Sequence, residues 1–562
     1  MKIYSPWAEV DVSGAKPLSP RLDTLEGKTI GLFAHFKGHS PLMLEVMAEL
    51  LRQRYPSLTF KPLQYKRDTS EVRKDPAFAA EVAEWAKDLD GVIGAYGDAG
   101  SCCMFHAYNC AYVERLGLPV VMLAKRDLVE VGQKAATTRL VPNLRFVPCD
   151  IPDLSWAPRL DQDVIDHVIR PGLAAVTDQV IAGLTAPLTE EEKTPYTKDN
   201  SHAHPFEYRD DLKGISDYFY QMGWTTGLPI QPPTEEAVAE MLTGTDLPRD
   251  HVVAELPPMM GKATVEKIAV NAVMAGCLPT YLPVLIAAVE AIAQPHIHLE
   301  GWTCSVASWF PLITVSGKVA RQIGVSMDGA ALSGYTKASA AIARAYSYLI
   351  MNLSGVRPGL EDMCEPGHEG RQGVCIGDNA EMSPWAPLHV RYGLDAEDSA
   401  VTMFWPQERT EGHGRDGKSC FDTMFYIHYQ GWDRGCCYVM SPGFARALAK
   451  EGFKSQQEVL DYVSEYCRQP SSEIFYRWMI ENNHLPSNVR LPFDQQNGSA
   501  RKFWSTDHLM IVVAGSDYDA TCINLAGGGE HGGPACSRIR LPHNWDELLE
   551  KYGSVKPEYL NY

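Results

Sequence analysis

Cysteine pairs of the C-x-x-C type are absent from this 562-residue sequence, although it contains 14 cysteines. Zinc knuckles and thioredoxin-type redox couples use such pairs, so their absence counts against both. Basic residues are also few: 51 lysines and arginines stand against 70 acidic residues, which leaves a net charge of −19. A chain with no basic stripe does not suit a nucleic-acid or anionic-membrane partner.

Long apolar runs are missing as well. The first residues, Met1-Lys-Ile-Tyr-Ser-Pro6, contain no apolar signal core. The longest apolar stretch, around 278–292, is broken by prolines, contains Glu290 and is too short for a membrane span. Because no secretory signal accompanies the cysteines, we expect a reduced, cytoplasmic setting and no membrane partner.

The remaining composition is that of a soluble globular protein, with 45% hydrophobic and 22% charged residues. Residues 28–150 alternate strand and helix signals, which predicts a doubly wound parallel sheet. The polar, proline-bearing stretch 186–206 reads as a linker. We therefore predict an α/β protein with three parts: an N-terminal α/β domain (1–155), a helix with its linker (156–206) and a larger mixed α/β (α+β) domain (207–562).

Hydrophobic periodicity places the individual elements. Expected strands cover 29–33, 58–63, 91–95, 118–123, 144–147, 312–315, 401–405 and 508–514. Expected helices cover 41–54, 77–88, 104–116, 163–184, 211–223, 264–275, 282–293 and 335–353, and a further one starts after Thr234.

The stretch Gly91–Cys103 is the most informative part of the chain. A short buried strand leads into a turn of small residues, and two cysteines stand where a helix should begin. A thiol at a helix N-terminus faces unpaired backbone N–H groups and the positive end of the helix dipole, which lower the pKa of a thiol. Cys102 is therefore a candidate nucleophile at the sheet edge where open α/β folds bind ligands.

Two other interpretations of this stretch stay open. Cys102 and Cys103 can be ordinary buried cysteines. The glycine turn can also hold a phosphate, although it lacks both the G-x-G-x-x-G pattern and a Walker lysine.

Several neighbours of Cys102 are candidates for catalysis or binding. Asp98 either orients a substrate or caps the helix, and capping is the commoner role. His106, one turn beyond Cys102, either tunes the thiol or is solvated. Lys37, after the first strand, either binds an anionic substrate group or is solvated. The backbone amides of Gly100 and Ser101 are expected to stabilise negative charge.

The second domain supplies further candidates. Asn271 and Cys277 flank a tight Gly-Cys-Leu-Pro turn, where a lone cysteine is usually structural. Asn379 and Glu381 lie in the Gly- and Pro-rich region 354–420, and long irregular loops often bind substrate. The glycine-rich loop 526–533 can wrap an anion with backbone N–H groups or can be a flexible loop.

Three histidine pairs have a spacing that a metal site could use, but none has a convincing third ligand nearby in the sequence. We therefore expect no metal site, and the sequence indicates no particular cofactor. The pairs are His35 and His39, His202 and His204, and His296 and His298.

Residues 28–124 resemble the UGSC-type (seleno)protein domain, whose name records selenocysteine or cysteine followed by Gly-Ser-Cys. The aligned tetrad is Ala99-Gly-Ser-Cys102, and Lys37 and the segment Arg115–Val121 also fit. The second region resembles the larger domain found with this family. Its marks are Gly223-Trp-Thr-Thr-Gly-Leu-Pro-Ile-Gln-Pro-Pro-Thr234, Ala263–Ala269, Asn271-Ala-Val-Met-Ala-Gly-Cys-Leu-Pro279, Asn379–Trp385 and Leu541–Asp546.

The resemblance implies thiol or selenol redox chemistry, or reductive cleavage of a small molecule, with a layout distantly similar to the selenoprotein subunits of glycine and proline reductases. This chain departs from the pattern at Ala99, where relatives can carry selenocysteine or cysteine. A disulfide between positions 99 and 102 is therefore impossible. Cys103 can replace the missing partner only by closing a strained eight-membered ring.

We predict a cytosolic enzyme that uses the Cys102 thiolate on a small organic, anionic substrate, with Cys103, Asp98 and His106 as further catalytic candidates. Single-thiol lyase or transfer chemistry and thiol redox chemistry both fit. Two alternatives remain: catalysis in the second domain, with or without a metal, beside a degenerate N-terminal site, or a non-enzymatic small-molecule-binding subunit. The sequence is compatible with a homo-oligomer.

Overall fold

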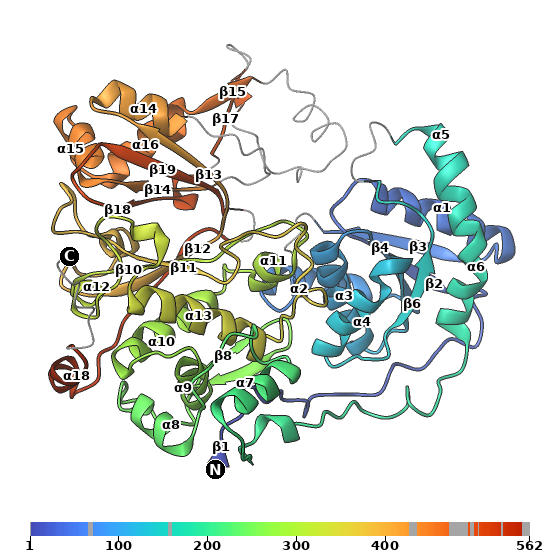
Figure 1. Cartoon of the computed structure of the whole chain (residues 1–562). Helices are drawn as coiled ribbons and strands as arrows, with labels where there is room; N and C mark the ends of the chain where they lie inside the picture. Colours follow the sequence, from blue (N-terminus) through green and yellow to red (C-terminus); the bar gives the residue numbers. More distant parts are fainter. Residues whose placement is uncertain are drawn as a thin grey trace.

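The structure is a computed structural model that describes residues 2–65, 71–154, 160–425, 435–470, 493–494, 499–503, 505–529 and 532–553. Figure 1 shows an N-terminal unit in blue and cyan beside a larger unit coloured from green to red. A hydrophobic cluster runs without a break from the N-terminal unit into the larger one.

The N-terminal unit is built on a parallel sheet of five strands in the order β3-β2-β4-β5-β6. The order in which strands are added therefore reverses between β2 and β4, which are neighbours in space although β3 separates them in sequence. The strands are β2 (Thr29–Ala34), β3 (Thr59–Gln64), β4 (Gly91–Gly97), β5 (Val120–Lys125) and β6 (Arg145–Cys149).

Helices cover both faces of this sheet because successive residues of each strand point to opposite sides. Ile30 and Leu32 pack under α1 (His39–Arg54) and α6 (Arg170–Thr185). Phe33 packs on the other face, which is covered by α2 (Pro76–Ala86), α3 (Gly100–Arg115) and α4 (Val129–Thr138). This arrangement confirms the predicted doubly wound α/β unit.

The larger unit stacks two four-stranded sheets between helices. One sheet has the order β11-β10-β12-β20 and the other β13-β19-β14-β18. Their facing side chains form one cluster, to which Leu312 contributes from the first sheet and Val439 and Val512 from the second. The outer faces pack against helices, so this unit has four layers.

Four strands of this unit are buried along their whole length, as expected for sheets that are covered on both faces. The strands are β10 (Leu312–Ser316), β11 (Val374–Gly377), β12 (Ala400–Phe404), β13 (Pro406–His413), β14 (Cys436–Met440), β18 (Leu509–Val513), β19 (Thr521–Gly527) and β20 (Ala535–Arg538). The covering helices are α9 (Val265–Met274), α10 (Leu282–Ile292) and α13 (Lys337–Asn352) on one side, and α14 (Gly417–Phe425), α15 (Pro442–Lys450) and α16 (Gln456–Tyr466) on the other.

The first residues of the chain pack against the larger unit. β1 (Lys2–Ile3) pairs with β7 (Phe206–Glu207), and the ammonium of the buried Lys267 donates to the carbonyl of Ser5 at 2.7 Å. The α6 helix, in contrast, belongs to the N-terminal unit, because it fills one face of the parallel sheet. Residues near the N-terminus and near 200 therefore tie the two units together.

The remaining elements are short. They are α5 (Gln162–Val164), η2 (Ile165–Ile169), α7 (Leu212–Gln221), α8 (Glu235–Leu242), β8 (Val252–Leu256), β9 (Gly261–Thr264), α11 (Leu299–Cys304), α12 (Lys318–Gln322), β15 (Arg468–Pro470), β16 (Phe493–Asp494), β17 (Ser499–Arg501), α18 (Trp545–Tyr552) and the single-turn segments η1 (Arg126–Leu128), η3 (Ser201–Ala203), η4 (Pro279–Tyr281), η5 (Ala331–Ser333), η6 (Leu388–Tyr392) and η7 (Thr506–His508).

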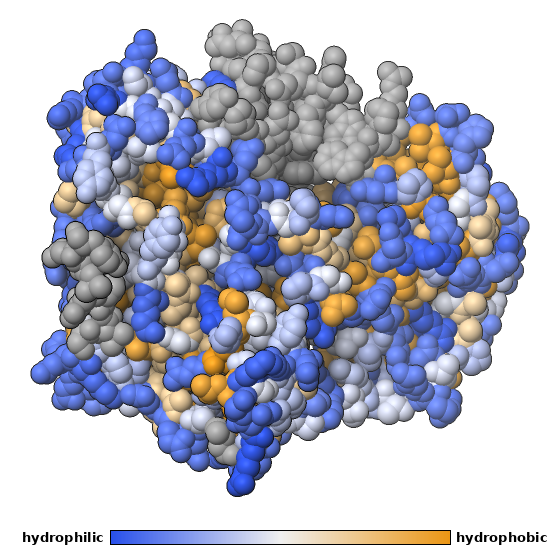
Figure 2. All heavy atoms as spheres, in the orientation of Figure 1, coloured by the Kyte–Doolittle hydropathy of each residue, from blue (hydrophilic) through white to orange (hydrophobic). Residues whose placement is uncertain are grey.

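The outer rim of the face shown in Figure 2 is mostly hydrophilic, and apolar residues gather in its middle and over the N-terminal unit. In the described part of the chain, no helix has both the length and the apolar character that crossing a bilayer requires.

Asp378 links the two stacked sheets and predicts a pH effect on stability. Its buried carboxylate accepts the backbone N–H groups of Leu388 (2.9 Å) and Val513 (3.2 Å). Burial raises the pKa of Asp378 from 3.8 to about 6, against the lowering effect of these bonds. The folded state thus holds this proton more tightly than the unfolded chain does, so the stability contribution is complete below pH 4 and is lost as the pH rises through 6.

We expect the free energy of unfolding of the wild type to lose about 3 kcal/mol from this group between pH 4 and pH 7. Asp378→Asn should lack this loss, because an asparagine does not titrate. Urea unfolding of both proteins at several pH values measures the difference, and Asp461→Asn on an exposed face of α16 is the matched control. Parallel pH profiles for wild type and Asp378→Asn would contradict this assignment.

Candidate active site at the sheet edge

The site lies where the strand order reverses. His35 follows β2 directly, Asp98 follows β4 directly, and these two strands run side by side in parallel. The backbone N–H of His35 donates to the carbonyl of Ala95 at 3.1 Å, so the two strand ends are locked together. Loops at such a reversal splay apart and leave a crevice, which is where open α/β sheets bind ligands.

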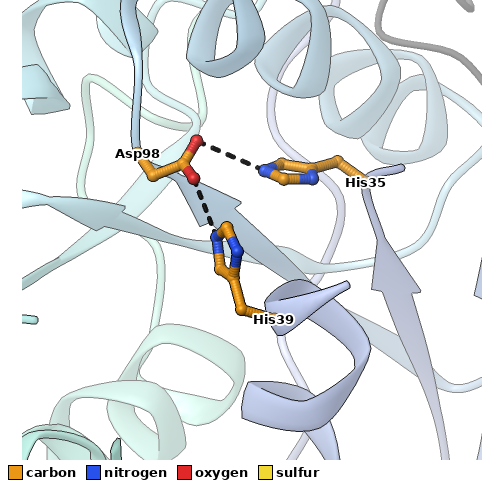
Figure 3. A group of neighbouring side chains, drawn as sticks. All are labelled: His35, His39 and Asp98. Carbon is orange, nitrogen blue, oxygen red and sulfur yellow. Dashed lines mark ion pairs between the residues drawn. The ribbon is translucent and has the colours of Figure 1, made fainter. Parts of the chain in front are cut away.

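Asp98 is the centre of a buried polar network. The ammonium of Lys37 donates to both oxygens of its carboxylate, at 2.9 and 3.0 Å. The Nε2 atoms of His35 and His39 lie 3.4 and 2.7 Å from those oxygens (Figure 3). All four side chains are buried, so these charges interact with little screening by water.

Lys37 and Asp98 hold each other in their charged forms. Burial alone would raise the pKa of Asp98, but the charge of Lys37 and the hydrogen bonds from His35 and His39 outweigh it and place the pKa well below 3.8. Burial likewise would lower the pKa of Lys37, yet the negative charges of Asp98, of a Cys102 thiolate and of Asp153 raise it above 10.5. Lys37 is therefore a permanent buried cation within electrostatic reach of Cys102.

His35 has a defined role in this network. Its Nδ1 accepts the backbone N–H of Lys37 at 3.1 Å, so the proton of the neutral ring is on Nε2 and points toward Asp98. Burial lowers the pKa of His35, which keeps the ring neutral. His35 thus directs the positive edge of its ring toward the carboxylate, 3.4 Å away.

The same three residues have the spacing of a metal site. One ligand atom from each of His35, His39 and Asp98 lies within 4.8 Å of the others. The donor chemistry does not fit, because His35 presents a proton rather than a lone pair to the centre and the Lys37 ammonium already neutralises the carboxylate. We therefore describe the cluster as a charged hydrogen-bond network that fixes Lys37.

Cys102 lies in the first turn of α3. The helix starts at Gly100, after the extended N-cap Ala99, and no side chain caps its N-terminus. The amides of Gly100 and Ser101 therefore lack intrahelical acceptors. Cys102 itself is partly exposed, while Cys103 beside it is buried. The residues expected to form a turn are thus the first helical turn.

Cys103 and His106 point into the protein. The Cys103 thiol faces the carbonyl of Leu128 at 3.5 Å, and burial raises its pKa. The His106 ring lies 3.3 Å from the hydroxyl of Tyr65, and burial holds the pKa of His106 well below 6.5. His106 is therefore neither solvated nor charged.

The structure also corrects the alternative readings of Asp98 and Lys37. Asp98 is not the cap of α3, because Ala99 holds the N-cap position and the carboxylate is engaged by Lys37. Lys37 is not solvated, since only 6% of its side chain is exposed. The loop after β2 folds back over the end of β4, which buries both residues.

The larger unit covers this edge of the sheet. A Cβ on Gly100 would lie 2.8 Å from the methyl group of Met363 and 3.6 Å from the carbonyl of Cys304, so the larger unit packs closely against the first residue of α3. α11 also contacts α3, and Figure 1 shows it between the two units. The larger unit therefore packs against the N-terminal end of α3.

The predicted residues of the second domain lie in other surroundings. Asn271 is buried and bonds to the carbonyls of Pro6 and Lys267, and the Cys277 thiol faces the carbonyl of Ala341. Asn379 and Glu381 both engage the guanidinium of Arg321, at 3.2 Å each. These contacts give each of the four side chains a structural role in the fold. Their role in substrate binding stays a prediction.

Two further sequence motifs, the glycine-rich loop and the first histidine pair, have different outcomes in the structure. The loop 526–533 is only partly described, because Glu530 and His531 lie outside the described residues. The pair His35 and His39, in contrast, gains a third polar partner in Asp98, which the sequence places 59 residues after His39.

Comparison with known proteins agrees with this geometry. Residues 2–170 match the model of the UGSC family, and this range holds the parallel sheet, the Asp98 network and Cys102. Neither a curated protein nor a solved structure matches the chain significantly. The N-terminal part of this chain is a UGSC-like domain.

Proposed function

We propose that the chain is a cysteine-dependent enzyme that acts on a small anionic organic substrate, with Cys102 as the nucleophile. The observation that carries the proposal is the buried, charged Lys37 within electrostatic reach of a partly exposed thiol at a helix N-terminus. A thiol near a lysine and a helix N-terminus reacts as the thiolate at neutral pH.

Each group of the site has one role in this proposal. Lys37 stabilises the thiolate of Cys102, and Asp98 with its two histidines keeps Lys37 in place. Because the Lys37 ammonium donates to Asp98, we assign the anionic group of the substrate to the uncapped amides of Gly100 and Ser101.

Single-thiol chemistry fits these surroundings better than a dithiol cycle. Ala99 has no sulfur, and the Cys103 thiol is directed at Leu128 inside the protein. In the proposed step, the thiolate forms a sulfur–carbon bond with the electrophilic centre while the leaving group departs with its electron pair. Water then attacks the adduct, breaks the sulfur–carbon bond and restores the thiol.

Alkylation of the intact protein by iodoacetamide tests the proposal, with the modified residue identified by peptide mass spectrometry. We expect Cys102 to react with a pH midpoint below about 8.5, the value of an ordinary thiol, because only the thiolate attacks. Cys364 is the internal control: it is also partly exposed, and burial raises the pKa of its thiol.

A midpoint for Cys102 at or above that of an ordinary thiol would contradict the proposal. So would full activity of Cys102→Ser on a substrate that the wild type converts, which would favour catalysis in the second domain.

A further inference from the structure

A cavity of about 340 Å³ lies where the two units meet. Residues between 131 and 138 of α4, together with Met104 of α3, line it from the N-terminal unit, and residues between 355 and 363 line it from the larger unit. Figure 1 shows α3 and α4 on the side of the N-terminal unit that faces the larger one. Lys198, from the segment that joins the units, and Trp7 also belong to the wall. The cavity has the size of a site for a small molecule.

The wall of this cavity is positively charged, although the chain as a whole has a net charge of −19. Among the described residues that line it, three are cations and one, Glu361, is an acid. The cations are Lys134, Lys198 and Arg357. Lys134 is paired with Glu130, which is not part of the wall, at 2.9 Å. Lys198 and Arg357 therefore decide which charge the cavity attracts.

Lys198 is the cation without a partner of its own. Within the described ranges of the chain, its ammonium makes neither a hydrogen bond nor an ion pair. The residue is half-buried, and its nitrogen is not fully buried, so a ligand in the cavity can touch it. Burial and the positive charge of Arg357 lower the pKa of Lys198. A bound anion would relieve this repulsion between the two cations.

Arg357 has donors to spare. Its Nε and Nη2 atoms donate to the two carboxylate oxygens of Glu361, at 3.0 and 2.6 Å. A guanidinium has five N–H groups, so three have no acceptor among the residues that the structure describes. The side chain of Arg357 is 41% exposed, against 13% for that of Glu361. Arg357 can thus receive a second carboxylate, and the charges of Lys198 and Arg357 then balance those of Glu361 and the ligand.

Apolar side chains make up much of the remaining wall. Four of them keep accessible surface that a ligand can cover: Leu360 is 43% exposed and the other three are half-buried. They are Trp7, Val131, Leu360 and Met363. Because covering apolar surface is favourable, a ligand that carries both a negative charge and an apolar body suits this wall best.

We infer that this cavity binds a small organic acid with one carboxylate and an apolar body, and that the carboxylate lies between Lys198 and Arg357. The inference goes beyond the chemistry proposed for Cys102 and does not rest on it, because Cys102 does not line the cavity. The bound acid would touch both units at once. It would also lie near the start of α3, because Met363 of the wall packs against Gly100.

Ligand-observed saturation-transfer NMR with the full chain tests the inference with four probes. Octanoate has the charge and the apolar body, octanamide is its neutral counterpart, octylamine carries the opposite charge, and acetate lacks the apolar body. We expect saturable binding of octanoate and at least about tenfold weaker binding of each of the other three. Equal or tighter binding of octanamide or octylamine would overturn the inference, as would absence of saturable octanoate binding.

Two lysine variants identify the cation. Lys198→Met keeps the apolar stem but removes the ammonium, and it should weaken octanoate binding by about five- to tenfold. Lys193→Met is the matched control: it makes the same change in the same segment, outside the cavity, where the lysine is paired with Glu190. Octanoate binding should be unchanged in Lys193→Met. Equal affinities in the two variants would contradict the role of Lys198.

A third variant locates the apolar body. Val131→Phe places a ring in the cavity and should abolish octanoate binding, with circular dichroism to verify the fold. Unchanged binding in this variant would place octanoate elsewhere and overturn the inference. Cys102→Ser should bind octanoate like the wild type, which separates this test from that of the proposed function.

Discussion

Replacing Lys37 by methionine is expected to slow the alkylation of Cys102 at pH 7 by at least about tenfold and to lower the free energy of unfolding by about 3–5 kcal/mol. Methionine fills the space of the lysine stem but removes the ammonium that lies 2.9 Å from Asp98. The carboxylate then stays buried without its counter-charge, and Cys102 loses a cation within electrostatic reach. Iodoacetamide kinetics and urea unfolding measure the two effects separately.

The pH dependence of this variant distinguishes lost charge from lost packing. Without Lys37, the Asp98 network gains stability by taking up a proton, so the deficit should shrink as the pH falls from 8 toward 5. A deficit caused by packing alone would not change with pH in this way.

The double variant Lys37→Met/Asp98→Asn is the matched control. Removing both charges leaves no unpaired ion in this network, so most of the lost stability should return. Cys102 should remain slow to alkylate, because the cation is still missing. Fast alkylation of Cys102 in either variant would show that Lys37 does not activate the thiol.

Much of the N-terminal fold could be predicted from local patterns. The buried runs near Thr29, Gly91 and Val120 are strands, and the helices between them have apolar residues at helical spacing. α4 was not predicted, because it is a short helix of ten residues with Gly132 in its interior and two threonines at its end, residues with low helix propensity. Turn-forming residues at 100–102 also hid the true start of α3, since Ala99 rather than Asp98 is the N-cap.

The Asp98 network could be predicted only in part, because it depends on the strand order. Asp98 and Cys102 were candidates from the sequence alone. His35 and His39 were recognised as a pair, but their third partner follows β4, which becomes a neighbour of β2 only after β3 is placed outside it. Burial of Lys37 had no local signal, because a lysine in a polar loop is usually solvated.

A second large effect is expected where the two units meet. Arg139→Met should lower the free energy of unfolding by about 3 kcal/mol, because it removes the central cation of a buried cluster. The Arg139 guanidinium lies 2.8 Å from Glu71 and 3.3 Å from Glu300, and its centre lies 3.6 Å from the ring centroid of Tyr108. Glu300 comes from α11 of the larger unit, so the loss should also weaken the contact between the units.

Arg126→Met is the matched control for this prediction. Arg126 makes an equally short two-pronged contact with Asp150, at 2.8 Å for each bond, but both side chains are more than half exposed. Exposed ion pairs contribute little because water screens them, so this variant should unfold like the wild type. Limited proteolysis should cut Arg139→Met faster near the contact between the units and leave Arg126→Met unchanged. Equal stability of the two variants would mean that the cluster of Arg139, Glu71 and Glu300 does not hold the units together.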